Sequence, residues 1–133
     1  MSEAFLLISI GPRRRLVRLS EVQEILSLMA LTPVDGASGS CRGIANLRGQ
    51  TVPIFDTSGA RAVLSPSRFI LMVQVEGSPV GLIVDEVHDV VSVEEGRIRR
   101  QPIGLGRTAE VVTLGSEILT VLDPGRAASA EIA

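Results

Sequence analysis

The chain is organised as short apolar runs separated by turn-forming residues, a pattern typical of β-strands joined by hairpins. Runs of aliphatic and β-branched residues such as FLLISI, FILMV and VGLIV recur along it. Gly11, Gly49, Gly77 and Gly115 each stand between two such runs. Glycine suits these positions because hairpin turns often need a backbone with positive φ. The pattern therefore predicts a mainly β protein with little helix.

Three stretches interrupt this pattern. In residues 20–28 the apolar positions share one helical face, so a helical turn with Ser20 as N-cap, passing into a strand, is expected. Residues 32–42 are rich in Gly, Ser, Asp and Pro and predict a loop. Residues 94–108 contain three glycines and one proline and predict a second, flexible loop. Near the C-terminal end, Pro124 followed by glycine disfavours a long helix.

Two blocks of the sequence occur twice in the same order. The segment that begins at Phe5 resembles the one that begins at Phe69, and IANLRGQTVPIFD resembles VVTLGSEILTVLD at nearly the same offset. The alternative is that any two amphipathic strand pairs look alike, but the shared order and offset favour a duplication. We therefore predict two small β-barrels of about five strands each. Residues 5–62 and 69–127 are the approximate halves, with strands free to be exchanged between them.

Composition narrows the chemistry that the chain can perform. The 133 residues carry a net charge of −2, and all thirteen basic residues are arginine. Without lysine, P-loop and Schiff-base chemistry is excluded. Cys41 and His88 are the only residues of their kinds, which argues against a disulfide, a zinc site or a nucleophile–base pair. We therefore expect no catalytic residue, no metal and no cofactor, and hence no enzyme.

Partners of two other kinds are also disfavoured. The balanced charge and the scarcity of aromatic residues argue against nucleic-acid binding. No apolar run approaches the ~20 residues that a spanning helix needs, so we expect a cytoplasmic protein without direct membrane insertion.

Two local motifs are candidate anion sites. GLGRTA, at residues 104–109, fits a dinucleotide-binding fingerprint, but no strand–helix context surrounds it. The run Arg13-Arg14-Arg15 could bind phosphate, but its place after Gly-Pro favours a solvated hairpin turn that protects a sheet edge.

One constellation resembles a known family. The stretch RGIANLRGQTVPIFD, from Arg42 to Asp56, follows SEVQEIL and LTPVDGA, and VGLIVDEVHDVVSV follows in the second half. Together they resemble the CheW-like coupling proteins of bacterial chemosensory systems, over about residues 5–123. The resemblance implies that residues 1–133 form a single CheW-like domain of two interlocked, SH3-like five-stranded barrels.

That resemblance also implies a function without chemistry. CheW-like proteins are scaffolds that couple a chemoreceptor of the methyl-accepting type to a CheA-type histidine kinase. The implied partners are the tip of the receptor's coiled-coil hairpin, bound in an apolar groove between the barrels, and the regulatory domain of the kinase, bound end to end. Other CheW-like proteins are further candidate partners, and recruitment to receptor clusters is implied.

Five residues are implied as the partner-binding surface. Glu24 and Arg48 match a facing pair near the family's binding surface, and Val22 matches an apolar surface position on the same element. Arg42 matches the basic residue before the glycine, and Val87 is the counterpart of Val22 in the second repeat. The alternative for the Glu24–Arg48 pair is that it only staples the first barrel.

Other interpretations stay open at this point. The segment between Pro102 and Val111 is shorter than in most relatives, and a brief tail replaces their C-terminal helix, so a specialised member that makes one contact is possible. Two further alternatives are a self-associating regulatory module of the kinase-domain type and a small-ligand-binding β-barrel. The output, whether flagella, surface motility or pili, is not encoded in these motifs.

Overall fold

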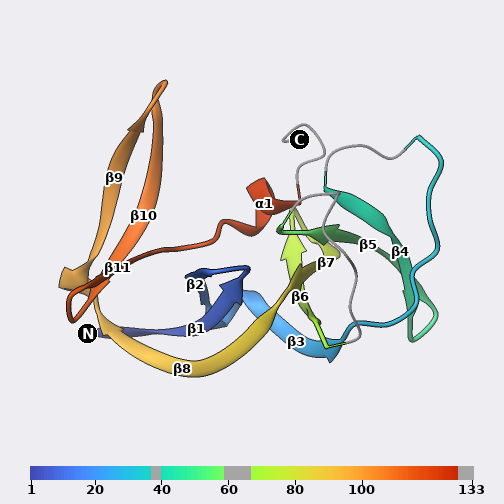
Figure 1. Cartoon of the computed structure of the whole chain (residues 1–133), viewed down its shortest axis with the longest axis horizontal. Coiled ribbons are helices and arrows are strands. Elements are labelled where there is room, and N and C mark those ends of the chain that lie inside the picture. The colour runs from blue at the N-terminus through green and yellow to red at the C-terminus, as the bar shows by residue number, and fades with distance from the viewer. Residues whose placement is uncertain (37–39, 59–66, 129–133) are drawn as a thin grey trace.

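The computed structural model describes residues 1–36, 40–58 and 67–128, and the chain in these ranges is mainly β (Figure 1). The prediction of a β protein with little helix is confirmed. The elements are β1 Ser2–Ile10, β2 Arg13–Arg18, the 3₁₀ turn η1 Leu19–Glu21, β3 Val22–Ser27, β4 Cys41–Leu47, β5 Gln50–Asp56, β6 Phe69–Val75, β7 Ser78–Val84, β8 Glu86–Glu94, the 3₁₀ turn η2 Glu95–Arg97, β9 Ile98–Gly104, β10 Arg107–Leu114, β11 Glu117–Thr120 and the short helix α1 Pro124–Ala127.

The first lobe is a curled five-stranded sheet in the order β3-β6-β7-β5-β4. Its two edges meet, because Thr32, which follows β3, exchanges two backbone hydrogen bonds with Ile44 of β4, at 2.8 and 2.9 Å. The curled sheet encloses six buried residues, which we call the first core: Ala45, Val52, Ile54, Ile70, Met72 and Ile83. Closing the edges in this way removes unpaired backbone groups that would otherwise attract other chains.

The second lobe joins two three-stranded sheets, β2-β1-β8 and β11-β10-β9. A parallel bridge between Leu16 and Val121 links them. Between the sheets lies the second core: Phe5, Leu7, Leu16, Val93, Val112, Leu119 and Val121. Six strands therefore surround this core, where about five were predicted.

A third apolar cluster, the inter-lobe core, fills the space between the lobes and contains, among others, Leu6, Ile8, Leu71, Val73 and Leu82. Strands β1 and β6 thus bury both faces, because neighbouring residues along each point into different cores. This explains why FLLISI and FILMV read as continuous apolar runs and not as alternating ones.

Each lobe mixes strands from the two halves of the chain. The first lobe takes β3 to β5 from the first half with β6 and β7 from the second, and the second lobe takes β1 and β2 with β8 to β11. This is the kind of exchange that the sequence analysis allowed. The duplication stays a prediction, and the boundary at residue 62 lies outside the described residues.

The structure confirms the predicted turns and changes the details of the predicted helical segments. Hairpin turns occur at all four predicted glycines, and a helical turn, η1, does lead into β3. Ser20 is not its N-cap: Arg18 holds that position, without a side-chain capping bond. At the other end of the chain, α1 spans four residues with Pro124 in its first turn, and Asp123 accepts a hydrogen bond from the Gly125 amide.

The predicted flexible loop at residues 94–108 is wrong. After η2 the chain forms the long β9–β10 hairpin, which projects from the body (Figure 1). Pro102 fits there because β9 pairs only with β10 among the described strands, so its outer edge needs no amide donor. The tip residues Gly104, Leu105 and Gly106 all have positive φ, which two glycines make accessible. Among the described residues, no helix is long and apolar enough to cross a membrane.

Candidate functional site

The β4–β5 hairpin presents Arg48 at its turn. Arg48 and Gly49 have φ of 53° and 82°, the positive values that a two-residue type I′ turn requires at both central positions. The Gly49 amide donates a hydrogen bond to Asn46 Oδ1 at 3.1 Å, which closes the turn. A tight, locally bonded turn therefore holds the Arg48 backbone and leaves its side chain largely in solvent.

Glu24 meets Arg48 across the seam of the first lobe. Arg48 Nη2 donates to Glu24 Oε2 at 2.5 Å, and this hydrogen bond raises the pKa of the guanidinium. The two residues belong to elements at opposite edges of the five-stranded sheet, since β3 and β4 are its outermost strands. The pair can form only because the sheet curls. The structure thus brings together the two residues that the resemblance implied.

Val22 lies on the other face of β3. A register shift between Val22 and Glu24 makes Val22 the partner of Val73 and Glu24 the partner of Met72. Val73 belongs to the inter-lobe core and Met72 to the first core. Without this bulge, residues two apart would share a face. The bulge therefore separates the apolar candidate from the charged pair.

Val87 occupies a matching place on the second lobe. It pairs with Ile8 of β1 and packs, half-buried, against the inter-lobe core. Val22 packs against the same core from the first lobe. The structure therefore places the two valines at the border of one apolar cluster, one from each side.

Arg42 is much less accessible than Arg48. Its side chain is 17% exposed, and its Nη1 lies 4.0 Å from Asp56 Oδ2. Asp56 is fully buried and binds Arg68 through two hydrogen bonds of 2.8 Å. Arg42 thus faces a buried network, and its role as a partner contact stays a prediction.

Sequence reasoning missed that network. Arg68 Nε also lies 2.8 Å from Asp85 Oδ1, and Asp85 Oδ2 accepts a hydrogen bond from the Gly11 amide. This hydrogen bond joins Asp85 to the β1–β2 turn. No motif pointed to Arg68, because it stands alone before an apolar strand.

Among the described residues, no group of three or more His, Cys, Asp or Glu side chains could hold a metal ion. What the surface offers is an exposed ion pair on one lobe and aliphatic side chains beside the junction of both lobes. Apolar and charged groups both contribute to protein–protein contacts, the apolar groups at the centre and the charged ones at the rim.

Comparison with known sequences identifies the family. The sequence model of the CheW-like domain matches residues 4–131, nearly the whole chain. The chain belongs to the CheW-like domain family. The resemblance inferred from the sequence motifs is confirmed.

Individual CheW-like relatives are moderately similar. Chemotaxis protein CheW of Rhizobium meliloti is 34% identical over 97 residues, which cover 70% of this chain and 63% of that protein. Chemotaxis protein CheW of Klebsiella aerogenes is 29% identical over 126 residues, covering 92% and 72%. Protein PilI of Pseudomonas aeruginosa is 37% identical over 81 residues, covering 58% and 46%. The chain thus spans a little under two thirds of the Rhizobium protein.

A solved structure confirms the fold. The scaffolding protein TtCheW from Thermoanaerobacter tengcongensis superimposes with a TM-score of 0.81, covering 93% of this chain and 86% of that one, at 22% sequence identity. The two-lobed β architecture is therefore that of a CheW-like protein.

Proposed function

We propose that this protein is a non-enzymatic adaptor that couples a chemoreceptor to a CheA-type histidine kinase. Its membership of the CheW-like family carries the proposal. The surface supports it, because an exposed arginine–glutamate pair and an apolar border between two lobes are binding features that need no chemistry. Such an adaptor works in the cytoplasm, recruited to receptor clusters.

The receptor contact is assigned to the border of the inter-lobe core. Val22 and Ile25 of β3 pair with Val73 and Leu71, both members of that core, so they share its side of the first lobe. Strands β3 and β8 both run along the lower side of the view in Figure 1. Ile25 remains exposed although it faces this side. An amphipathic helix can cover such an aliphatic border with its apolar stripe.

The second lobe contributes in the same way. Val87 and Val90 of β8 pair with Ile8 and Leu6 of the inter-lobe core, and Val90 is exposed. A helical hairpin lying along the junction would therefore touch both lobes. The exposed Arg48, oriented by Glu24, supplies a charged contact that fixes the register of the partner.

Reconstitution tests this function. A receptor cytoplasmic fragment, a CheA-type kinase and this protein are mixed, and kinase autophosphorylation and co-sedimentation are measured. We expect receptor control of the kinase with wild-type protein and its loss with Arg48→Glu. Arg99→Glu is the control, because Arg99 is an exposed arginine on the remote strand β9.

One result would contradict the adaptor function, and another would contradict the role of Arg48 in it. Wild-type protein that self-associates but binds neither component would favour the self-associating module. Full coupling by Arg48→Glu would remove Arg48 from the binding surface.

A further inference from the structure

Strand β2 carries arginines on both faces, and the two faces differ. Because side chains alternate along a strand, Arg14 and Arg18 point to one side while Arg13 and Arg15 point to the other. On the first side every guanidinium has a carboxylate. Arg14 Nη1 donates to Glu117 Oε1 at 2.8 Å, and Arg18 binds Glu110 through two hydrogen bonds of 2.5 and 2.6 Å.

On the second side the arginines lack such partners. Within the described part of the chain, no carboxylate lies within ion-pair distance of Arg13 or Arg15. Arg15 is nevertheless half-buried, and burial together with the nearby Arg13 charge lowers the pKa of its guanidinium. Two like charges in a partly desolvated place are unfavourable unless an anion joins them.

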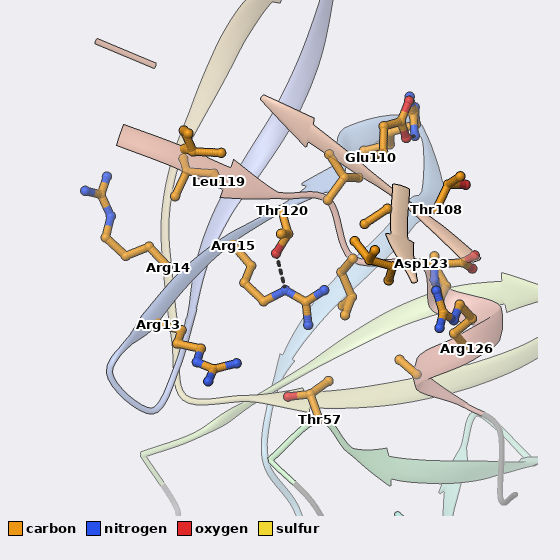
Figure 2. Close-up of a pocket in the computed structure, with 18 of the residues that line it drawn as sticks. Arg13, Arg14, Arg15, Thr57, Thr108, Glu110, Leu119, Thr120, Asp123 and Arg126 are labelled. Atoms are coloured by element: carbon orange, nitrogen blue, oxygen red, sulfur yellow. Dashed lines mark hydrogen bonds and ion pairs between the residues drawn. The ribbon is translucent and has the colours of Figure 1, made fainter. Parts of the chain in front are cut away.

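The Arg15 side chain is held in place. Its Nε donates a hydrogen bond to Thr120 Oγ1 at 3.0 Å. This bond uses the Nε edge of the guanidinium, and the side chain faces a space that Arg13 and Thr57 also line (Figure 2). A guanidinium fixed in this way can receive a carboxylate with two parallel hydrogen bonds.

That space belongs to a large cleft. It has a volume of about 1080 Å³ and is lined by the β1–β2 turn and the start of β2, the β9–β10 hairpin, β11 and α1. Exposed aliphatic side chains also line it, notably Ile103 and Ile118. A small oxyanion would occupy only the arginine end and leave these apolar groups in water. A chain segment carrying both carboxylates and aliphatic groups fits the whole cleft.

We propose that this cleft docks an acidic, partly apolar segment of a partner protein, with its carboxylates on Arg15 and Arg13. None of the residues that line the cleft belongs to the five candidates of the coupling surface, so both sites can be occupied together. The sequence analysis favoured a solvated turn for the whole arginine run. Arg15 does not fit that description, because its side chain is half-buried and is held by the hydrogen bond to Thr120.

The test is fluorescence anisotropy with a fluorescein-labelled peptide of sequence LEELEELE. We expect saturable binding that weakens as ionic strength rises, because exposed charge pairs are screened by salt. Replacing both Arg13 and Arg15 by Gln should weaken binding at least about tenfold, as loss of central charged anchors does. The double variant Arg97→Gln/Arg99→Gln, which removes the same number of charges outside the cleft, is the matched control and should bind like the wild type.

Further measurements distinguish the proposed docking site from unspecific charge attraction and from a small-anion site. The glutamine peptide LQQLQQLQ should not bind, and inorganic phosphate should not displace the acidic peptide at concentrations near its Kd. Equal weakening by Arg97→Gln/Arg99→Gln would reveal unspecific charge attraction, and displacement by phosphate would reveal a small-anion site. Either result overturns the proposal, as does absence of binding. Circular dichroism of each variant shows that it is folded. Arg48→Glu, which changes the coupling surface, should bind the peptide like the wild type. Absence of peptide binding would overturn the docking proposal without contradicting the proposed coupling function.

Discussion

Two arginine–carboxylate pairs in the first lobe share their chemistry and differ in their surroundings. Arg68 and Asp56 have side chains 5% and 0% exposed, and two hydrogen bonds of 2.8 Å join them. Arg48 and Glu24 are 79% and 33% exposed and meet at the seam of the sheet. The buried pair is closed to any partner, whereas the exposed arginine keeps most of its surface for one.

The difference also decides what each pair contributes to stability. Breaking a buried ion pair leaves an uncompensated charge in a medium of low dielectric, which is costly. Exposed pairs gain little, because water and salt screen them and the side chains lose entropy. A purely structural role for Glu24 and Arg48 therefore predicts a small effect on folding, and a recognition role predicts a large effect on binding.

The largest effect is expected at Arg68. Arg68→Ala should lower the free energy of unfolding by about 3–5 kcal/mol, because it strands the Asp56 carboxylate inside the protein. The loss should be large because Arg68 also holds Asp85, which contacts the β1–β2 turn of the second lobe. Urea denaturation followed by circular dichroism measures it, with Arg99→Ala as the exposed control. A loss no larger than that of the control would show that burial does not make the Arg68–Asp56 pair a larger contributor to stability than an exposed pair such as Arg48–Glu24.

An intermediate effect is expected at the partly buried pair of Arg18 and Glu110. The hydrogen bond from Arg18 lowers the pKa of Glu110 below its ordinary value of 4.5. A carboxylate with a lowered folded pKa contributes stability that is complete above its unfolded pKa and is lost as the pH falls through its folded pKa. Glu110→Gln should therefore destabilise the protein at neutral pH and much less in acid.

Solvent screening limits this contribution to about 1 kcal/mol. Urea midpoints of wild type and Glu110→Gln, compared at about pH 7 and about pH 3, measure it, since the reference pKa of Glu lies between them. A stability difference that stays constant with pH would show that the charge of Glu110 is not involved.

Much of this architecture follows from local patterns. The apolar runs and the turn glycines predict the β1–β2, β4–β5, β6–β7 and β10–β11 hairpins, because these signals lie within a few residues of each other. The β9–β10 hairpin was missed, since β9 is almost wholly exposed and shows no alternation of apolar and polar positions. Its charged and proline-containing sequence resembles a loop until the strand beside it is known.

Contacts between distant segments were harder to predict. The motifs identified Glu24 and Arg48 only through family resemblance, because their meeting depends on the curling of a five-stranded sheet. The bulge that separates Val22 from Glu24 arises from the pairing with β6, which no local pattern encodes. That Arg13 and Arg15 have no carboxylate partner among the described residues depends equally on where β11 and the β9–β10 hairpin come to lie.

The smallest effect on folding is expected at Arg48, where the comparison is sharpest. Arg48→Glu should leave the circular dichroism spectrum and the melting temperature nearly unchanged, because the side chain is largely solvated. It should nevertheless abolish binding to the receptor fragment or the kinase, which calorimetry measures. The double variant Glu24→Arg/Arg48→Glu restores an ion pair with reversed charges. Partial recovery of binding would identify the pair as an internal orienter, whereas no recovery would show that the partner reads the positive charge of Arg48 itself. If Arg48→Glu unfolds the protein, or if the variant still binds its partner, the exposed pair serves only to join the two edges of the sheet in the first lobe.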